Sequence, residues 1–197
     1  MDFQWDKERI ILVISTLLSL AGAYPIIRLD WKKYGLLFVL AGIVGNVLCL
    51  IFVTLGFYSF PKTLIPIIEV NMPFTALLTV FPVIVLAGIR YSPKPWSFKI
   101  PFYWAVIHLG MLAETLALNF TGLISYEFKW DFWDSYTWWW IFLLGFEWIG
   151  GMIIPDHLRK PINASSFLYG RELWAVFHFI LIITIFLGGY YLGRISR

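Results

Sequence analysis

Three glutamates inside long apolar runs are the residues of this sequence best suited to chemistry. Glu69, Glu114 and Glu147 each interrupt a stretch that is otherwise rich in aliphatic and aromatic side chains. A carboxylate at the centre of a bilayer costs about 2.5–3.5 kcal/mol on insertion scales, so each one is expected to face the protein interior or a wet cavity. We therefore take Glu114, Glu147, Glu69 and the nearby Asn71 as a candidate buried polar site for a ligand or a proton.

Glu114 and Glu147 flank an aromatic, charged connector at similar distances along the chain. At about 1.5 Å per helical residue, both would lie roughly 15 Å deep, near the middle of a ~30 Å hydrocarbon layer. Gly110 and Gly151 lie four residues from them, each toward the same end of the bundle. The pattern predicts that the two carboxyl groups converge and share a proton, or bind one cation or polar group between them. The alternative is that protonated glutamates only hydrogen-bond across helices and hold the bundle together.

Two histidines offer a different chemistry. His108 and His178 are expected at equal depth on two helices, which is what bis-histidine ligation of a haem b in a membrane bundle requires. A metal site built from histidine and glutamate is a related option. The alternative is that both rings only hydrogen-bond inside the bundle, and we expect no cofactor.

Tryptophans gather around the connector. Trp130, Trp133 and Trp138 could form a rim that stacks a flat or cationic ligand. The alternative is an aromatic belt at the membrane surface. The sequence has no GxxxxGK[ST], HExxH or GxSxG motif, so it does not indicate an enzyme.

The composition indicates the class of protein that positions these side chains. Of 197 residues, 60% are hydrophobic and only 14% are charged, and the mean hydropathy is +0.77, so there is too little polar surface to cover a soluble globule. The net charge is +3, but the basic residues lie at the ends of apolar runs, which favours topology signals over nucleic-acid binding. The single cysteine, Cys49, excludes an intrachain disulfide.

The apolar runs predict an all-α, polytopic membrane helix bundle that forms a single domain over residues 1–197. Six transmembrane helices are expected at residues 10–27, 34–57, 63–89, 100–124, 137–155 and 172–192. Pro66 and Pro73 each remove a helix donor, so the third span should be kinked or unwound near Glu69. Between the fourth and fifth spans we expect a short interfacial helix or turn, because a lone strand would leave its backbone unpaired near lipid.

Loop charges predict the orientation. The loops 28–33, 90–99 and 156–171 hold nine Lys and Arg residues, whereas the opposite loops and the termini hold six. The positive-inside rule then places both termini outside and makes the aromatic connector external.

The passage from Asn119 to Tyr126 carries a family resemblance. Together with Glu114 before it and Trp130 and Trp133 after it, the passage resembles the signature of an uncharacterised family of small multi-spanning membrane proteins from spore-forming bacteria. That family has a glutamate in a span, then a Thr-x-Leu-Ile-x-Tyr element, then spaced tryptophans. The similarity covers approximately residues 55–150. It implies a multi-spanning topology in a bacterial cytoplasmic membrane and no particular reaction.

These observations favour an integral membrane protein that acts as a small permease-like bundle or as a membrane subunit of a larger assembly. One alternative is the substrate-binding membrane subunit of an importer, which the short loops and the aromatic rim resemble in plan. Another is a membrane cytochrome or intramembrane enzyme that uses His108 and His178. The expected partners are the lipid bilayer and a second protein or another copy of the chain, and not nucleic acid.

Overall fold

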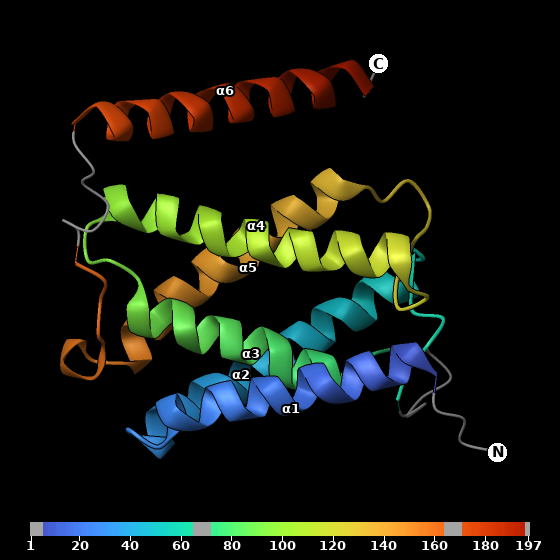
Figure 1. Cartoon of the computed structure of the whole chain (residues 1–197), viewed down its shortest axis with the longest axis horizontal. Coiled ribbons are helices and arrows are strands. Elements are labelled where there is room, and N and C mark those ends of the chain that lie inside the picture. The colour runs from blue at the N-terminus through green and yellow to red at the C-terminus, as the bar shows by residue number, and fades with distance from the viewer. Residues whose placement is uncertain (1–5, 65–71, 164–170, 196–197) are drawn as a thin grey trace.

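The computed structural model describes residues 6–64, 72–163 and 171–195 (Figure 1). These residues form an all-α fold, as predicted, apart from one short strand pair and a single 3-10 turn, η1 (Asp156–Leu158). The helices are α1 (Lys7–Ile27), α2 (Trp31–Thr54), α3 (Phe74–Tyr91), α4 (Trp96–Phe120), α5 (Phe132–Ile153) and α6 (Arg171–Ile195). The strands are β1 (Tyr58–Ser59) and β2 (Ser125–Tyr126).

Local signals in the sequence fix where the helices begin. Asp6 and Asp30 cap α1 and α2, because their carboxylates accept backbone N–H bonds from the first turn at 2.9 and 3.1 Å. Asp131 caps α5 in the same way, in a capping box with Asp134. No side chain caps α3, which starts directly after Pro73, a residue that supplies no helix donor of its own.

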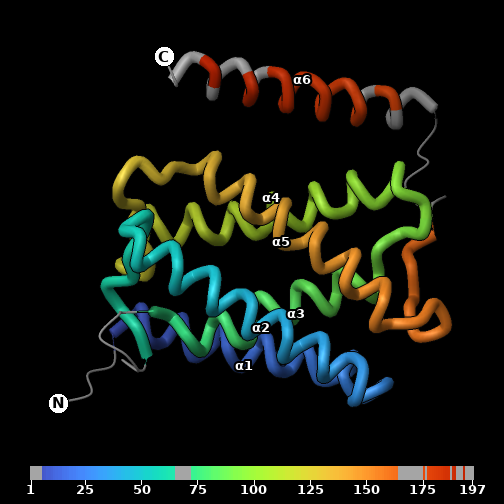
Figure 2. The backbone as a smooth tube through the Cα atoms, turned by 180° about the vertical axis from the view of Figure 1, so that it is seen from behind, coloured from blue at the N-terminus to red at the C-terminus, as the bar shows by residue number. Residues whose placement is uncertain are grey.

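Helix α3 is the centre of the bundle and contacts α1, α2, α4 and α5. Its residues Val85, Leu86 and Ile89 are almost fully buried in the main hydrophobic core. Figure 1 and Figure 2 show α1, α2 and α3 on one side, α4 and α5 next to them, and α6 outermost. Ring contact between Trp104 on α4 and Phe177 on α6, with centroids 5.9 Å apart, links α6 to the bundle.

Four of the described helices, α1 to α4, are long and apolar enough to cross a membrane. Helix α5 contains Asp134, Glu147 and three consecutive tryptophans, and it is not among these four. In α6 the apolar stretch found among the described residues is shorter, Phe177–Phe186. The helices are therefore compatible with a membrane protein, whereas membrane crossing by α5 and α6 remains a prediction.

The connector between α4 and α5 contains a turn, in which the backbone N–H of Trp130 donates to the carbonyl of Glu127 at 2.9 Å, and also a strand that was not expected. Residues Tyr126 and Ser125 of β2 pair antiparallel with Tyr58 and Ser59 of β1. The argument against a strand assumed that it would have no partner, but the loop after α2 supplies one. Phe57 extends this pairing, because its carbonyl accepts the backbone N–H of Glu127 at 2.8 Å.

Helix ends also shift relative to the predicted spans. Helix α4 ends at Phe120 instead of residue 124, and α5 begins at Phe132 instead of residue 137. Glu114 is therefore about 9 Å from the connector end of α4, whereas Glu147 is about 22 Å from the connector end of α5, at 1.5 Å per residue. The prediction that the two glutamates lie at equal depth is wrong.

The third predicted span is shorter in the structure than the range 63–89, because α3 begins only at Phe74. Glu69 and Asn71 lie in the segment 65–71, which is outside the described residues. The break expected near Glu69 therefore stays a prediction.

Candidate functional site: an apolar cavity beside Glu114

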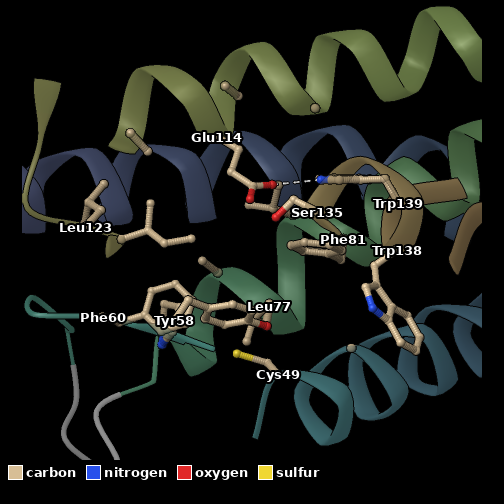
Figure 3. A pocket seen from close by; sticks show the side chains of 18 of the residues that line it. Cys49, Tyr58, Phe60, Leu77, Phe81, Glu114, Leu123, Ser135, Trp138 and Trp139 are labelled. Carbon is tan, nitrogen blue, oxygen red and sulfur yellow. Dashed lines mark hydrogen bonds between the residues drawn. The ribbon is translucent and has the colours of Figure 1, made fainter. Parts of the chain in front are cut away.

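Glu114 lies on α4 with its carboxylate turned toward α5 (Figure 3). Its Oε1 accepts a hydrogen bond from the Tyr126 hydroxyl at 2.8 Å, and its Oε2 accepts one from Trp139 Nε1 at 2.9 Å. Burial, and then the negative charge of Glu114, raise the pKa of Tyr126, so that its hydroxyl stays protonated and able to donate. Two neutral donors thus hold this carboxylate in place.

Gly110 explains how the indole reaches the carboxylate. A Cβ atom at this position would lie 3.0 Å from the ring of Trp139, which is closer than ordinary packing allows. Trp139 also stacks on Phe81, with centroids 4.8 Å apart and an angle of 14° between the rings. The glycine one turn from Glu114 therefore admits a close contact between α4 and α5.

A cavity of about 340 Å³ opens beside Glu114, between the first five helices and the strand-bearing loops. Its walls are mostly aliphatic and aromatic side chains from α1 to α5. Glu114 is the single charged side chain among the described residues that line it. Ser15 of α1 also lines it, as do the polar side chains of Cys49, Tyr58 and Ser135 (Figure 3).

Two of the three predicted rim tryptophans line this cavity. Trp130 and Trp138 are lining residues, and both pack on Phe52, with ring centroids 5.1 and 4.7 Å apart. Trp133 is not a lining residue: its ring lies 3.7 Å from where a Cβ at Gly188 of α6 would stand. Trp139, which was not among the three predicted rim residues, lines the cavity instead.

Glu147 lies in a different environment, buried in a polar cluster and only 3% exposed. Its Oε2 accepts hydrogen bonds from Ser92 Oγ at 3.0 Å and Tyr103 Oη at 2.6 Å. Its Oε1 pairs with the ammonium of Lys99 and with Arg159 Nη1, the latter at 3.3 Å. This set, called here the Glu147 cluster, neutralises the carboxylate with two cations.

The segment after α5 holds Arg159 in the Glu147 cluster. Arg159 Nε donates to the carbonyl of Ile154 at 3.3 Å, and its Nη2 lies 3.7 Å from where a Cβ at Gly151 would stand. The carbonyl of Leu158 accepts hydrogen bonds from Tyr34 Oη and from Arg90 Nη1 of α3, both at 2.8 Å. The Glu147 cluster therefore joins the ends of several helices to the loop after α5.

The structure does not bring Glu114 and Glu147 together, so the prediction that they share a proton is wrong. Trp139, the partner of Glu114, precedes Glu147 by eight residues on α5, which is about 12 Å along a helix. A Cβ at Gly110 would lie 3.0 Å from Trp139, whereas a Cβ at Gly151 would meet Arg159 Nη2 at an ordinary 3.7 Å. The sequence pattern assigned the two glycines to one site, but their neighbours belong to two.

The candidate haem ligands lie on α4 and α6. His108 Nδ1 is 2.8 Å from the carbonyl oxygen of Trp104, so this nitrogen carries the proton and donates. Its ring also contacts Tyr136 on α5, with centroids 5.5 Å apart. His178 is half-buried on α6. Within the part of the chain that the structure describes, no three His, Cys, Asp or Glu side chains form a metal-binding group, and ligation by the two histidines stays a prediction.

Sequence reasoning missed the partners that define both sites. Lys99 and Arg159 were counted as loop charges that set topology, yet both are in contact with Glu147. Tyr103 follows Lys99 by one helical turn, and this spacing could have shown that the two share a face. Trp139 is the middle one of three consecutive tryptophans. The sequence alone did not show which of the three faces α4, where Trp139 donates to Glu114.

Comparisons with known proteins add no family to this description: no family model, curated protein or solved structure matches the chain. The resemblance to membrane proteins of spore-forming bacteria therefore stays a prediction. Function has to be argued from the geometry of the site itself.

Proposed function

We propose that this protein is an integral membrane protein of the permease type, which binds an apolar small molecule in the cavity beside Glu114. The observation that carries the proposal is the cavity of about 340 Å³ with apolar walls and one carboxylate. Small-molecule sites typically have volumes of about 300–1,000 Å³, with apolar walls and a few polar groups that fix the ligand's orientation.

The positions of the two glutamates support this role. The cavity is lined at one end by Tyr58 of β1, by Phe60 directly after it, and by Leu123 two residues before β2. The Glu147 cluster ties the opposite ends of the helices together. A ligand entering from the strand end would meet a closed bundle below it, which is the arrangement expected of one state of a carrier. The resemblance to membrane proteins of spore-forming bacteria favours a bacterial cytoplasmic membrane, and the loop charges favour an orientation with the strand end outside.

Native mass spectrometry of the purified protein tests whether the cavity holds a ligand. Gly45 of α2 lines the cavity, and a Cβ there would meet only Phe142, at 3.9 Å. The substitution Gly45→Leu should therefore fill the cavity without a backbone clash. Gly35 of the same helix has no atom within 4 Å of its Cβ position, so Gly35→Leu is a matched control outside the cavity.

The wild type and Gly35→Leu should retain a small apolar ligand, either co-purified or supplied from a panel, that Gly45→Leu does not retain. Equal retention by all three proteins, or none by the wild type, would contradict the proposal. Uptake of the identified ligand into liposomes that contain this chain alone then separates a permease from an importer subunit that only captures its substrate.

A further inference from the structure

Charge and aromatic content around the cavity indicate what kind of ligand it takes. This inference rests on the proposed function and deepens it. We propose that the ligand is a small lipophilic cation, with its positive charge against Glu114 and the neighbouring aromatic rings and its apolar part in the rest of the cavity.

The partners of Glu114 leave its charge uncompensated. Glu147 is in contact with Lys99 and Arg159, whereas none of the ion pairs formed by the described residues involves Glu114. Its two hydrogen-bond donors, Tyr126 and Trp139, are both neutral. A carboxylate accepts about four hydrogen bonds, so acceptor capacity remains on both oxygens. An apolar wall penalises an uncompensated carboxylate, so a cationic ligand has a specific advantage here.

Aromatic rings surround the same carboxylate. In the close view, Trp138, Trp139 and Phe81 lie on one side of Glu114, and Tyr58 and Phe60 lie across the cavity (Figure 3). The faces of such rings attract a cation, with tryptophan the strongest, and the attraction grows when the cation is desolvated. A cation in this cavity would therefore meet a formal charge close to aromatic side chains, although the faces of Trp139 and Phe81 that stack on each other are not open to it.

The rest of the wall selects against a strongly hydrated cation. It is formed mainly by side chains such as Leu48, Leu77, Leu123 and Phe142, which cannot replace a hydration shell. A quaternary or tertiary ammonium with an apolar chain fits these walls, because its charge is spread over methyl groups and it is weakly hydrated. The chemistry is the same whether the ammonium is a free molecule or a choline headgroup of a lipid.

Two ligands of equal shape test the charge requirement: hexyltrimethylammonium and its neutral carbon isostere, 2,2-dimethyloctane. Binding is measured by native mass spectrometry from nanodiscs of anionic lipid without choline, as the excess over Gly45→Leu. The wild type should bind the cation about tenfold or more tightly than the isostere. Glu114→Gln should remove this preference and keep binding of the isostere, while Glu114→Asp should retain part of it.

A second variant tests the preference for the cation in case Glu114→Gln does not fold. Trp138→Leu keeps the carboxylate and removes one ring of the wall, so it should weaken binding of the cation severalfold more than it weakens binding of the isostere. Competition by phosphatidylcholine added to the nanodiscs would identify a lipid headgroup as the source of the ammonium, and its failure to compete would identify a free molecule.

The outcomes separate this inference from the proposed function. If the wild type binds both ligands equally, or if Glu114→Gln keeps the preference for the cation, the ligand class is wrong and the cavity still binds. If neither ligand binds in excess of Gly45→Leu, the proposed function fails as well.

Discussion

Two glutamates of the same chain are held by opposite kinds of partner, and this difference separates their roles. Glu114 accepts bonds from a phenol and an indole at the wall of a cavity. Glu147 is enclosed with Lys99 and Arg159. A buried carboxylate compensated by protein cations serves the fold, whereas one without such compensation is available to a ligand.

Breaking the Glu147 cluster should destabilise the protein strongly. Glu147→Gln leaves Lys99 and Arg159 as buried cations without their counter-charge, so the free energy of unfolding should fall by about 3–5 kcal/mol. The control is Glu127→Gln, which changes an exposed carboxylate that accepts a hydrogen bond from Ser59 and should cost less than about 0.5 kcal/mol. Unfolding in mixed micelles measures the free energy of unfolding of both variants. An equal loss in Glu147→Gln and Glu127→Gln would show that Glu147 has no special structural role.

Asp6 should make the stability sensitive to acid. The backbone N–H of Arg9, together with the ammonium of Lys62 at 3.2 Å, holds the pKa of Asp6 below its usual range. A carboxyl whose pKa is lowered on folding stabilises the protein above its unfolded pKa of about 3.9, and this stabilisation is lost as the pH falls through the folded-state pKa.

The variant Asp6→Asn keeps a capping side chain and removes the charge. Its melting temperature should therefore lie below that of the wild type near neutral pH and approach it in strong acid. A difference that stays constant across a pH titration of thermal unfolding would contradict this expectation.

At the scale of elements, the sequence predicts helices well and their partners poorly. Each apolar run predicted the existence of one of the six helices. This was possible because a helix satisfies the backbone hydrogen bonds of an apolar segment without a partner from elsewhere in the chain. The strand pair was missed because Tyr58 and Tyr126 are far apart in the sequence. The Glu147 cluster was missed for the same reason, since Lys99 and Glu147 are separated by 48 residues.

Small errors at helix ends had large consequences for the candidate site. Asp131 and its capping box start α5 five residues before the predicted boundary at 137. The shift moved Glu147 away from the depth of Glu114 by more than a helical turn. Together with the earlier end of α4, this shift decided whether the sequence implied one shared carboxylate site or two separate ones.

Packing between α3 and α5 depends on Gly150. A Cβ at this position would lie 2.5 Å from Cδ1 of Ile89, which is itself buried. We expect Gly150→Ala to lower the free energy of unfolding by about 1–3 kcal/mol through overpacking. On the same helix, Gly145 has no atom within 4 Å of its Cβ position, so Gly145→Ala should be neutral or stabilise by up to about 1 kcal/mol. Unfolding curves of the two variants and the wild type measure these differences. A Gly150→Ala protein as stable as the wild type would mean that α3 and α5 are less tightly packed than described.

For the whole molecule, the structure combines a cavity near the strand end with an ionic cluster at the other end. The outer faces of the helices carry many exposed apolar side chains, among them Leu17, Leu18, Leu109 and Phe186. Such surfaces suit contact with lipid acyl chains. The cavity is thus enclosed by helices whose outer faces suit a bilayer, which agrees with the proposal of a lipophilic ligand.

Modification of Cys49 tests occupancy of the cavity most directly. Cys49 is the single cysteine of the chain and lines the cavity, so it reports from inside without an engineered label. The rate of its reaction with the small reagent methyl methanethiosulfonate is measured with and without hexyltrimethylammonium. A ligand in the cavity should slow the reaction severalfold in the wild type and in Gly35→Leu, and not in Gly45→Leu. Unchanged modification of Cys49, at ligand concentrations that saturate binding, would place the ligand elsewhere and contradict the account.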